Sequence, residues 1–205
     1  MMEEVSTLTA AEAAQTRRSI RRFTDDPVPD EDLREILRLA GLAPSAFNLQ
    51  PWRWVVVRDA ETKERLRDAA NGQRQVTAAP AVIVLYSDMR DVLDDLDATI
   101  HPGVQGEARE RTAANLRRTF GAMSEQEREG WGASQSFIAL GYLLLIARSM
   151  GYDSSAMGGF DPAKVKAVLG LPAHVRVNAL VAIGVGDEQG YPHHRHDVER
   201  IAAFR

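Results

Sequence analysis

The chain has 205 residues, of which 44% are hydrophobic and 26% charged, and its formal net charge is −4. These values are typical of one soluble globular domain, and the acidic balance argues against a broad nucleic-acid-binding face. The chain has no cysteine, which excludes disulfides, thiolate catalysis and cysteine-ligated metals and fits a reducing cytoplasm.

The N-terminal stretch MMEEVSTLTAAEAAQ is acidic and has no apolar core, so no signal peptide is expected. Thr9 and Glu12 have capping-box spacing, which predicts a helix from about residue 10 toward Arg17. The segment PDEDLREILRLAGLAP places apolar residues at helical spacing. It predicts a second helix with Asp30 as its N-cap and Pro44 as its stop.

Three later runs read as strands, at 52–59, 80–88 and 178–186, and the second is apolar enough to be buried on both faces. Helices are predicted over about 60–70 and over 134–150, and a short one follows Asp161. The run FIALGYLLLIA, within 134–150, is too short to span a bilayer, so we expect a buried helix and no membrane contact.

Residues 89–133 are charged, with few apolar positions. They predict one or two exposed helices, which we interpret as an insertion over 89–130 that lies over the core. Strands that are few and separated by helices favour an α+β fold with a modest sheet around the helix at 134–150. We find no repeat and no linker, so residues 1–205 are expected to form a single domain.

The stretch RRSIRRF, residues 17–23, is the densest positive charge in an acidic chain. If the first helix continues through it, Arg17 and Arg21 lie on one face, where like charges repel. A phosphate dianion would compensate, with guanidinium contacts and the Ser19 hydroxyl as a further donor. The alternative is a solvated charge run whose arginines pair with nearby acidic residues.

Two loops have the composition of binding segments. LAPSAFNLQPW, at 42–52, carries Ser45, Asn48 and Gln50 among apolar residues, and amides suit a heterocycle that offers both donors and acceptors. MGGFDP, at 157–162, has two glycines that would let the backbone approach a ligand. The alternatives are an ordinary connecting loop and a tight turn.

The tail segment YPHHRHD holds three of the five histidines but lacks the companions of a metal site. Its Arg195 could complete a phosphate pocket. No catalytic triad, paired carboxylates or nucleophile elbow is visible, so no side chain is assigned as catalytic. If the protein is an enzyme, its reactive chemistry belongs to a bound cofactor.

In order along the chain, several segments together resemble the FMN-dependent nitroreductase family, the NAD(P)H nitroreductase-like flavoproteins. These are RRSIRRF, LAPSAFNLQPWRWVVV, NGQRQVTAAPAVIVL, SQSFIALGYLLLIARSMGYDSSAMGGF and LVAIGVGDE. The resemblance covers nearly the whole chain except residues 89–130. It implies an α+β fold, an intertwined homodimer and FMN held at the dimer interface.

The resemblance also implies the residues that bind FMN. The arginines of RRSIRRF and of the tail segment YPHHRHD would hold the FMN phosphate. The loop LAPSAFNLQPW would contribute to the site from the partner subunit. The remaining residues would lie beside the flavin ring, with Gln73 and Gln75 as alternatives. The matching positions are Arg17, Arg18, Ser19, Arg21 and Arg195, then Pro44, Ser45, Ala46, Asn48 and Gln50, then Gln73, Gln75, Met157, Gly158 and Gly159.

The implied reaction is ping-pong hydride transfer from NADH or NADPH through flavin N5 to a nitroaromatic, a quinone or a related acceptor. Residues 89–130 would form a lid that sets substrate choice. The alternatives on the same fold are enone reduction, dehalogenation or flavin destruction, and a further one is a non-catalytic flavin-binding module. A nucleic-acid contact through the arginines is disfavoured by the acidic balance.

Overall fold

The computed structural model describes residues 7–205; the first six residues, which begin the stretch where no signal peptide is expected, lie outside it. The strands are β1 (Trp52–Val57), β2 (Ala81–Ser87), β3 (Asp153–Met157) and β4 (Arg176–Gly184). The helices are α1 (Ala10–Thr16), α2 (Asp30–Ala40), η1 (Ala46–Asn48), α3 (Ala60–Ala69), α4 (Gln75–Ala78), α5 (Met89–Asp94), η2 (Leu96–Ala98), α6 (Gly106–Gly121), α7 (Glu125–Ser149), α8 (Pro162–Leu169) and α9 (Val198–Ile201).

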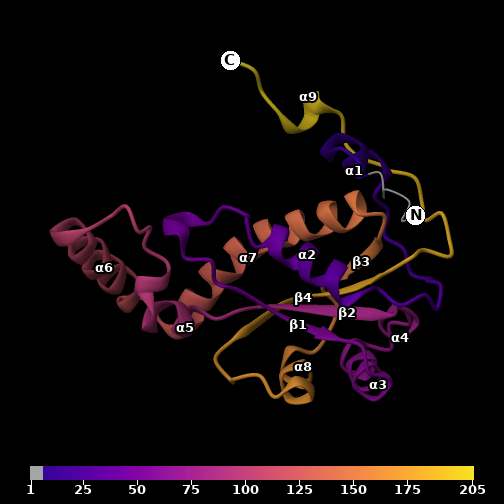
Figure 1. Cartoon of the computed structure of the whole chain (residues 1–205), viewed down its shortest axis with the longest axis horizontal. Helices are drawn as coiled ribbons and strands as arrows, with labels where there is room; N and C mark the ends of the chain where they lie inside the picture. Colours follow the sequence, from indigo (N-terminus) through magenta and orange to yellow (C-terminus); the bar gives the residue numbers. More distant parts are fainter. Residues whose placement is uncertain (1–6) are drawn as a thin grey trace.

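The four strands form one antiparallel sheet in the order β1-β2-β4-β3. Helices α2 and α7 cover one face of this sheet, and α3 and α8 cover the other (Figure 1). The predicted α+β class is therefore confirmed. Because strands that are neighbours in sequence are joined through helices, no tight hairpin connects two of them directly.

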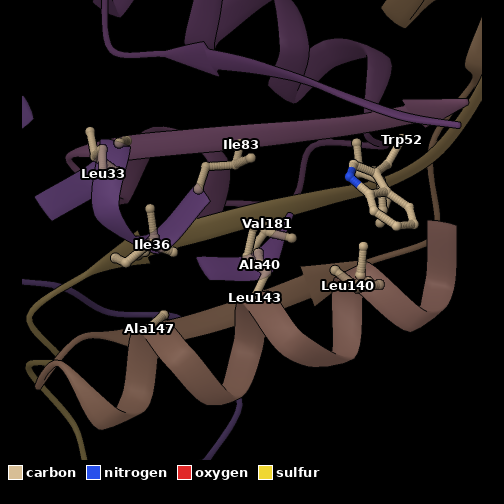
Figure 2. Packing of buried hydrophobic residues seen from close by; sticks show 14 of the residues in the cluster. Leu33, Ile36, Ala40, Trp52, Ile83, Leu140, Leu143, Ala147 and Val181 are labelled. Atoms are coloured by element: carbon tan, nitrogen blue, oxygen red, sulfur yellow. The ribbon is translucent and has the colours of Figure 1, made fainter. Parts of the chain in front are cut away.

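The larger core lies between the sheet and the α2 and α7 layer. Ile83 and Val181 project from the sheet onto Leu143 and Ala147 of α7 and Ile36 of α2, and all five are fully buried (Figure 2). On the other face, Val82 and Leu180 pack against Leu66 of α3 and Val165 of α8. Strand β4 is buried from Val177 to Gly184 because it has a neighbour on each edge and a helical layer on each face.

Helix α7 starts nine residues earlier than the apolar pattern predicts. Ser124 accepts from the backbone N–H of Glu127, and the Glu127 carboxylate accepts from the Ser124 N–H, which makes a capping box. The first turns are polar, so hydrophobic periodicity does not reveal them. By length and composition α7 would qualify as a membrane-spanning segment, a property shared by the core helices of soluble proteins.

One other prediction at this level is wrong, and one strand was not anticipated. Asp30 is the first helical residue of α2 rather than its cap, and Pro29 occupies the N-cap position. Strand β3 was not predicted, because DSSAM has no β-branched or aromatic residue to mark it. It forms through pairing with β4, since Asp153 to Met157 align with Gly184 to Leu180.

The segment 89–130, which we interpret as an insertion, contains α5, η2 and α6, and α6 projects away from the sheet (Figure 1). The insertion has a core of its own, in which Met89, Leu96, Leu116 and Phe120 are buried. The buried Glu129 of α7 fixes the start of the insertion next to β2. Its carboxylate accepts from the Met89 N–H at 2.8 Å and from the Ser87 hydroxyl at 3.1 Å. The insertion is therefore a small packed unit fastened to the central helix.

A matched pair of glycine substitutions tests the packing of β4. At Gly184 a Cβ would lie 2.5 Å from Pro80 Cδ and 2.7 Å from Pro80 Cγ, whereas at Gly121, the last residue of α6, it would meet nothing within 4 Å. We expect Gly184→Ala to lower the free energy of unfolding by about 1–3 kcal/mol through overpacking. Gly121→Ala should leave it equal or raise it by up to about 1 kcal/mol.

Chemical denaturation of both variants measures this difference. An unchanged stability for Gly184→Ala would contradict the close approach of Pro80 to β4.

Candidate functional site

The arginine cluster lies at the end of the sheet where β3 begins and β4 ends. Helix α1 stops at Thr16, and Arg17 is its C-cap. Ser19 then pairs with Ser154 of β3, and Phe23 pairs with Gly186 just after β4. The segment is therefore extended rather than helical, and the expected one-face placement of Arg17 and Arg21 on a helix is wrong. The buried Ile20 and Phe23 hold the segment against the sheet.

Although the local geometry differs, the arginines do gather around one cavity. A pocket of about 200 Å³ is lined by Arg17, Arg18, Ser19, Arg21, Tyr191, Pro192, His193 and Arg195. Partial burial, and then the charges of Arg195 and Arg18, lower the pKa of Arg17. Among the carboxylates of residues 7–205, none lies within 4.0 Å of a guanidinium that lines this pocket. The Glu188 carboxylate accepts from the Arg21 backbone N–H at 2.6 Å, but it is not among the lining residues, so the described lining concentrates positive charge.

The arginines differ in whether their guanidinium groups already form hydrogen bonds or ion pairs within the chain. The Arg18 guanidinium donates to the carbonyls of Gln15 and Arg17, at 2.7 and 2.9 Å. Arg22, which the sequence analysis left outside the site, pairs with Glu188 at 3.4 Å, and its side chain is 70% exposed. Four guanidinium groups and the Ser19 hydroxyl suit a phosphate dianion, because all of them donate hydrogen bonds.

A second group of predicted residues gathers where β3 ends. The side-chain amides of Asn71 and Gln73 donate to the carbonyl oxygen of Gly159, at 3.0 and 2.9 Å. Gln75 is buried and donates to the Gln73 side chain at 3.1 Å, so Gln73 is the glutamine that faces the two glycines. A Cβ on Gly158 would meet no atom within 4 Å outside its chain neighbours, so the space on that side of the glycine is open. The Met157 side chain is buried in the sheet, so only its backbone faces this group.

Asn71 was missed by the sequence analysis. Its φ is 55°, in the left-handed region that asparagine tolerates better than most residues. The available signal was the Asn-Gly pair after a predicted helix, which is typical of a turn with positive φ.

The third group is the loop Pro44–Gln50, which contains η1. Phe47, Asn48 and Gln50 all have positive φ, at 58°, 58° and 44°. Such strain persists only where surrounding contacts hold it, and it is common at functional sites. The Gln50 N–H donates to the Ser45 hydroxyl at 3.0 Å, and the Ala46 N–H donates to Gln135 of α7 at 2.9 Å. Phe47 is 63% exposed.

The amides of this loop are already engaged within the chain. Asn48 donates to the Thr99 carbonyl at 2.8 Å, and Gln50 donates to the Asn48 side chain at 3.1 Å. Leu49 is fully buried in the core of the insertion. Neither Gln135 nor the insertion was expected to support the loop, because both contacts join segments more than 50 residues apart in sequence.

Sheet register determines which groups lie together. Ser19 pairs with Ser154 and Gly158 follows four residues later, so the first two groups lie about 13 Å apart along β3. The loop instead precedes Trp52, which pairs with Ser87, and Ser87 pairs with Arg176 at the start of β4. Along β4 the loop is therefore about 20 Å from the arginines, and β3 and β1 are opposite edges of the sheet. Within one chain the loop and the arginines are apart.

Comparisons with known proteins show which family the chain is similar to. The family model described as the nitroreductase family matches residues 14–186. A Thermus thermophilus protein named NADH dehydrogenase is 54% identical over 97% of each chain. A Bacillus subtilis protein assigned as an NAD(P)H nitroreductase is 33% identical over 95% of this chain and 96% of its own.

Two solved structures are similar over almost their whole length. A nitroreductase family protein from Streptococcus pneumoniae has a TM-score of 0.86 and 30% identity, covering 96% of this chain and all of its own. A protein of Exiguobacterium sibiricum, described as a nitroreductase in complex with FMN, has a TM-score of 0.86 and 27% identity, covering 98% and 99%. On the match over residues 14–186 and the 54% identity, this chain belongs to the nitroreductase family.

Proposed function

We propose that this NAD(P)H-dependent oxidoreductase acts as an FMN-dependent homodimer that delivers hydride to a nitroaromatic, a quinone or a related acceptor. The observation that carries the proposal is the pocket of about 200 Å³ in which four arginines and a serine face one space without a carboxylate. Crowded guanidinium groups repel one another, and a phosphate dianion turns that repulsion into charge-assisted hydrogen bonds. In this proposal the FMN phosphate occupies the pocket.

The ring end of FMN would lie at Gly158 and Gly159, about 13 Å from the phosphate pocket along β3. That separation matches the scale of an extended mononucleotide. Without side chains at Gly158 and Gly159, the backbone N–H groups of this turn are accessible to the ring. Asn71 and Gln73 hold the Gly159 carbonyl and so fix the direction of the turn.

When bound, FMN supplies the ability to accept hydride from NAD(P)H and to reduce an acceptor. The protein residues then need only to bind, orient and shield the reacting groups, which agrees with the lack of an assigned acid or base. With a nitroaromatic, one NAD(P)H and one proton convert the nitro group to a nitroso group and release one water.

The homodimer is proposed because one chain leaves its own site incomplete. The strained loop Pro44–Gln50 lies about 20 Å along the sheet from its own arginines, yet it carries the features of a binding segment. A second chain would bring its loop to the first chain's pocket. Helix α7 presents exposed Ile138, Tyr142 and Leu145, which suit such an interface.

The insertion over 89–130 is proposed to form a wall of the active site and to limit substrate choice. It supports the loop directly through Leu49 and through the bond from Asn48 to Thr99. In the proposed dimer, the insertion of each chain would stay packed on its own loop and would therefore lie close to the flavin bound by the other chain. The cytoplasm is the proposed location, since the chain has no cysteine to require an oxidising compartment.

The first test is the visible spectrum of the purified protein, followed by turnover. We expect flavin absorption, bleaching on addition of NADH or NADPH without oxygen, and recovery of colour when a nitroaromatic is added. A protein that is colourless and does not take up added FMN would contradict the proposal. Flavin that binds but is not bleached by either reductant would indicate a non-catalytic flavin-binding module.

The second test concerns the phosphate pocket. We expect Arg17→Ala to weaken FMN binding by at least about tenfold, because a hydrogen bond to a charged group contributes about 1.5–3 kcal/mol. Riboflavin, which lacks the phosphate, should be affected far less. Titration of the apoprotein by flavin fluorescence gives both dissociation constants, and Arg22→Ala is the control because Arg22 already pairs with Glu188. Equal losses for FMN and riboflavin would exclude the phosphate role.

The third test concerns the tether of the loop. Asn48→Ala removes the hydrogen bond to the Thr99 carbonyl. It also places an alanine at φ 58°, in the left-handed region that asparagine tolerates better than alanine does. We expect it to weaken FMN binding by about 1–2 kcal/mol. Asn48→Gly loses the same bond but adopts positive φ without strain, so its loss should be smaller. If both variants bind FMN as the wild type does, the loop does not take part in the site.

A further inference from the structure

A cavity that was not anticipated from the sequence lies beside the proposed flavin ring. It has a volume of about 520 Å³ and extends from Gly158 between the start of α7, the start of α8 and the start of β4. Two aromatic rings line it, Phe137 from α7 and Phe160 from the segment before α8. A cavity of this size with aromatic walls suits a small aromatic molecule.

The charged groups that line this cavity are Glu125, Glu129, Lys166, His174 and Arg176. Both carboxylates already have partners. Glu125 pairs with Arg90 at 2.6 Å. The two oxygens of Glu129 accept from Met89 and Ser87, and burial raises the pKa of Glu129. His174 pairs with Asp88 at 3.0 Å. The acidic residues therefore offer little free negative charge to a ligand.

The two cations have no such partners. Among the carboxylates of residues 7–205, none lies within 4.0 Å of Arg176 or Lys166. Arg176 is exposed at the first position of β4, and its guanidinium lies beside α7, with one terminal nitrogen 3.9 Å from where a Cβ on Gly130 would be. Lys166 donates to the Ala173 carbonyl, which leaves its charge unmatched. The uncompensated charge of the cavity is therefore positive.

We propose that this cavity binds aromatic electron acceptors that carry an anionic group, with Arg176 and Lys166 recognising the charge and Phe137 and Phe160 contacting the ring. The inference rests on the proposed function, because it assigns the acceptor class of the same active site. A guanidinium at the rim suits a carboxylate, which it binds in a bidentate manner. Neutral acceptors of the same shape gain only the ring contacts.

The test compares 4-nitrobenzoate with 4-nitrobenzamide, which have nearly the same shape and differ in charge. We expect wild-type holoenzyme to have a KM for 4-nitrobenzoate about tenfold lower than for 4-nitrobenzamide. Arg176→Gln should remove most of this preference by raising the KM for the benzoate alone, with kcat little changed. Lys164→Gln, on α8 but outside the cavity lining, is the control and should keep the preference.

A second measurement does not depend on turnover. Titration of the oxidised holoenzyme with benzoate and with benzamide, followed by the flavin absorption, should show tighter binding of benzoate that is lost in Arg176→Gln. If FMN binds and both nitro compounds are reduced without any charge preference, the inference is wrong and the proposed function stands. If the protein binds no FMN, the proposed function fails and the inference fails with it.

Discussion

The burial of β4 on both faces is the constraint on which the rest of the structure depends. Its residues from Val177 to Gly184 are enclosed by β2, β3 and two helical layers, so neither the register nor the direction of the strand is free to change. One end of β4 carries Arg176 and the large cavity, and the segment after its other end pairs with Phe23 beside the arginine pocket. A rigid central strand thus sets the distance between the two ends of the proposed flavin site.

The arginine pocket shows how the fold holds an arrangement that is unfavourable by itself. Arg17 loses solvation and lies near the charges of Arg195 and Arg18, both of which disfavour its protonated form. The position is maintained by apolar anchors, since Ile20 and Phe23 are buried next to the sheet. Core packing therefore keeps cations together before any anion is bound, which is the condition for a preorganised phosphate site.

The insertion and the strained loop depend on each other. Leu49 fills the core of the insertion, and Asn48 donates to Thr99, while Phe47, Asn48 and Gln50 keep positive φ values. The insertion and the loop therefore form one supporting unit, and a change in either would alter how the loop is held in the proposed FMN site.

The sequence by itself determined the α+β class, the three apolar strands, and the arginine, loop and glycine segments, because periodicity and local composition reflect local structure directly. It did not reveal β3, whose DSSAM sequence has no strand propensity and which forms only by pairing with β4. It left open whether the first helix continues through the arginines, and the pairing of Ser19 with Ser154 shows that the segment is extended. Tertiary structure alone decided that Gln135 and Thr99 support the loop and that Arg176 lines the same cavity as Phe137 and Lys166, because these contacts join residues far apart in sequence.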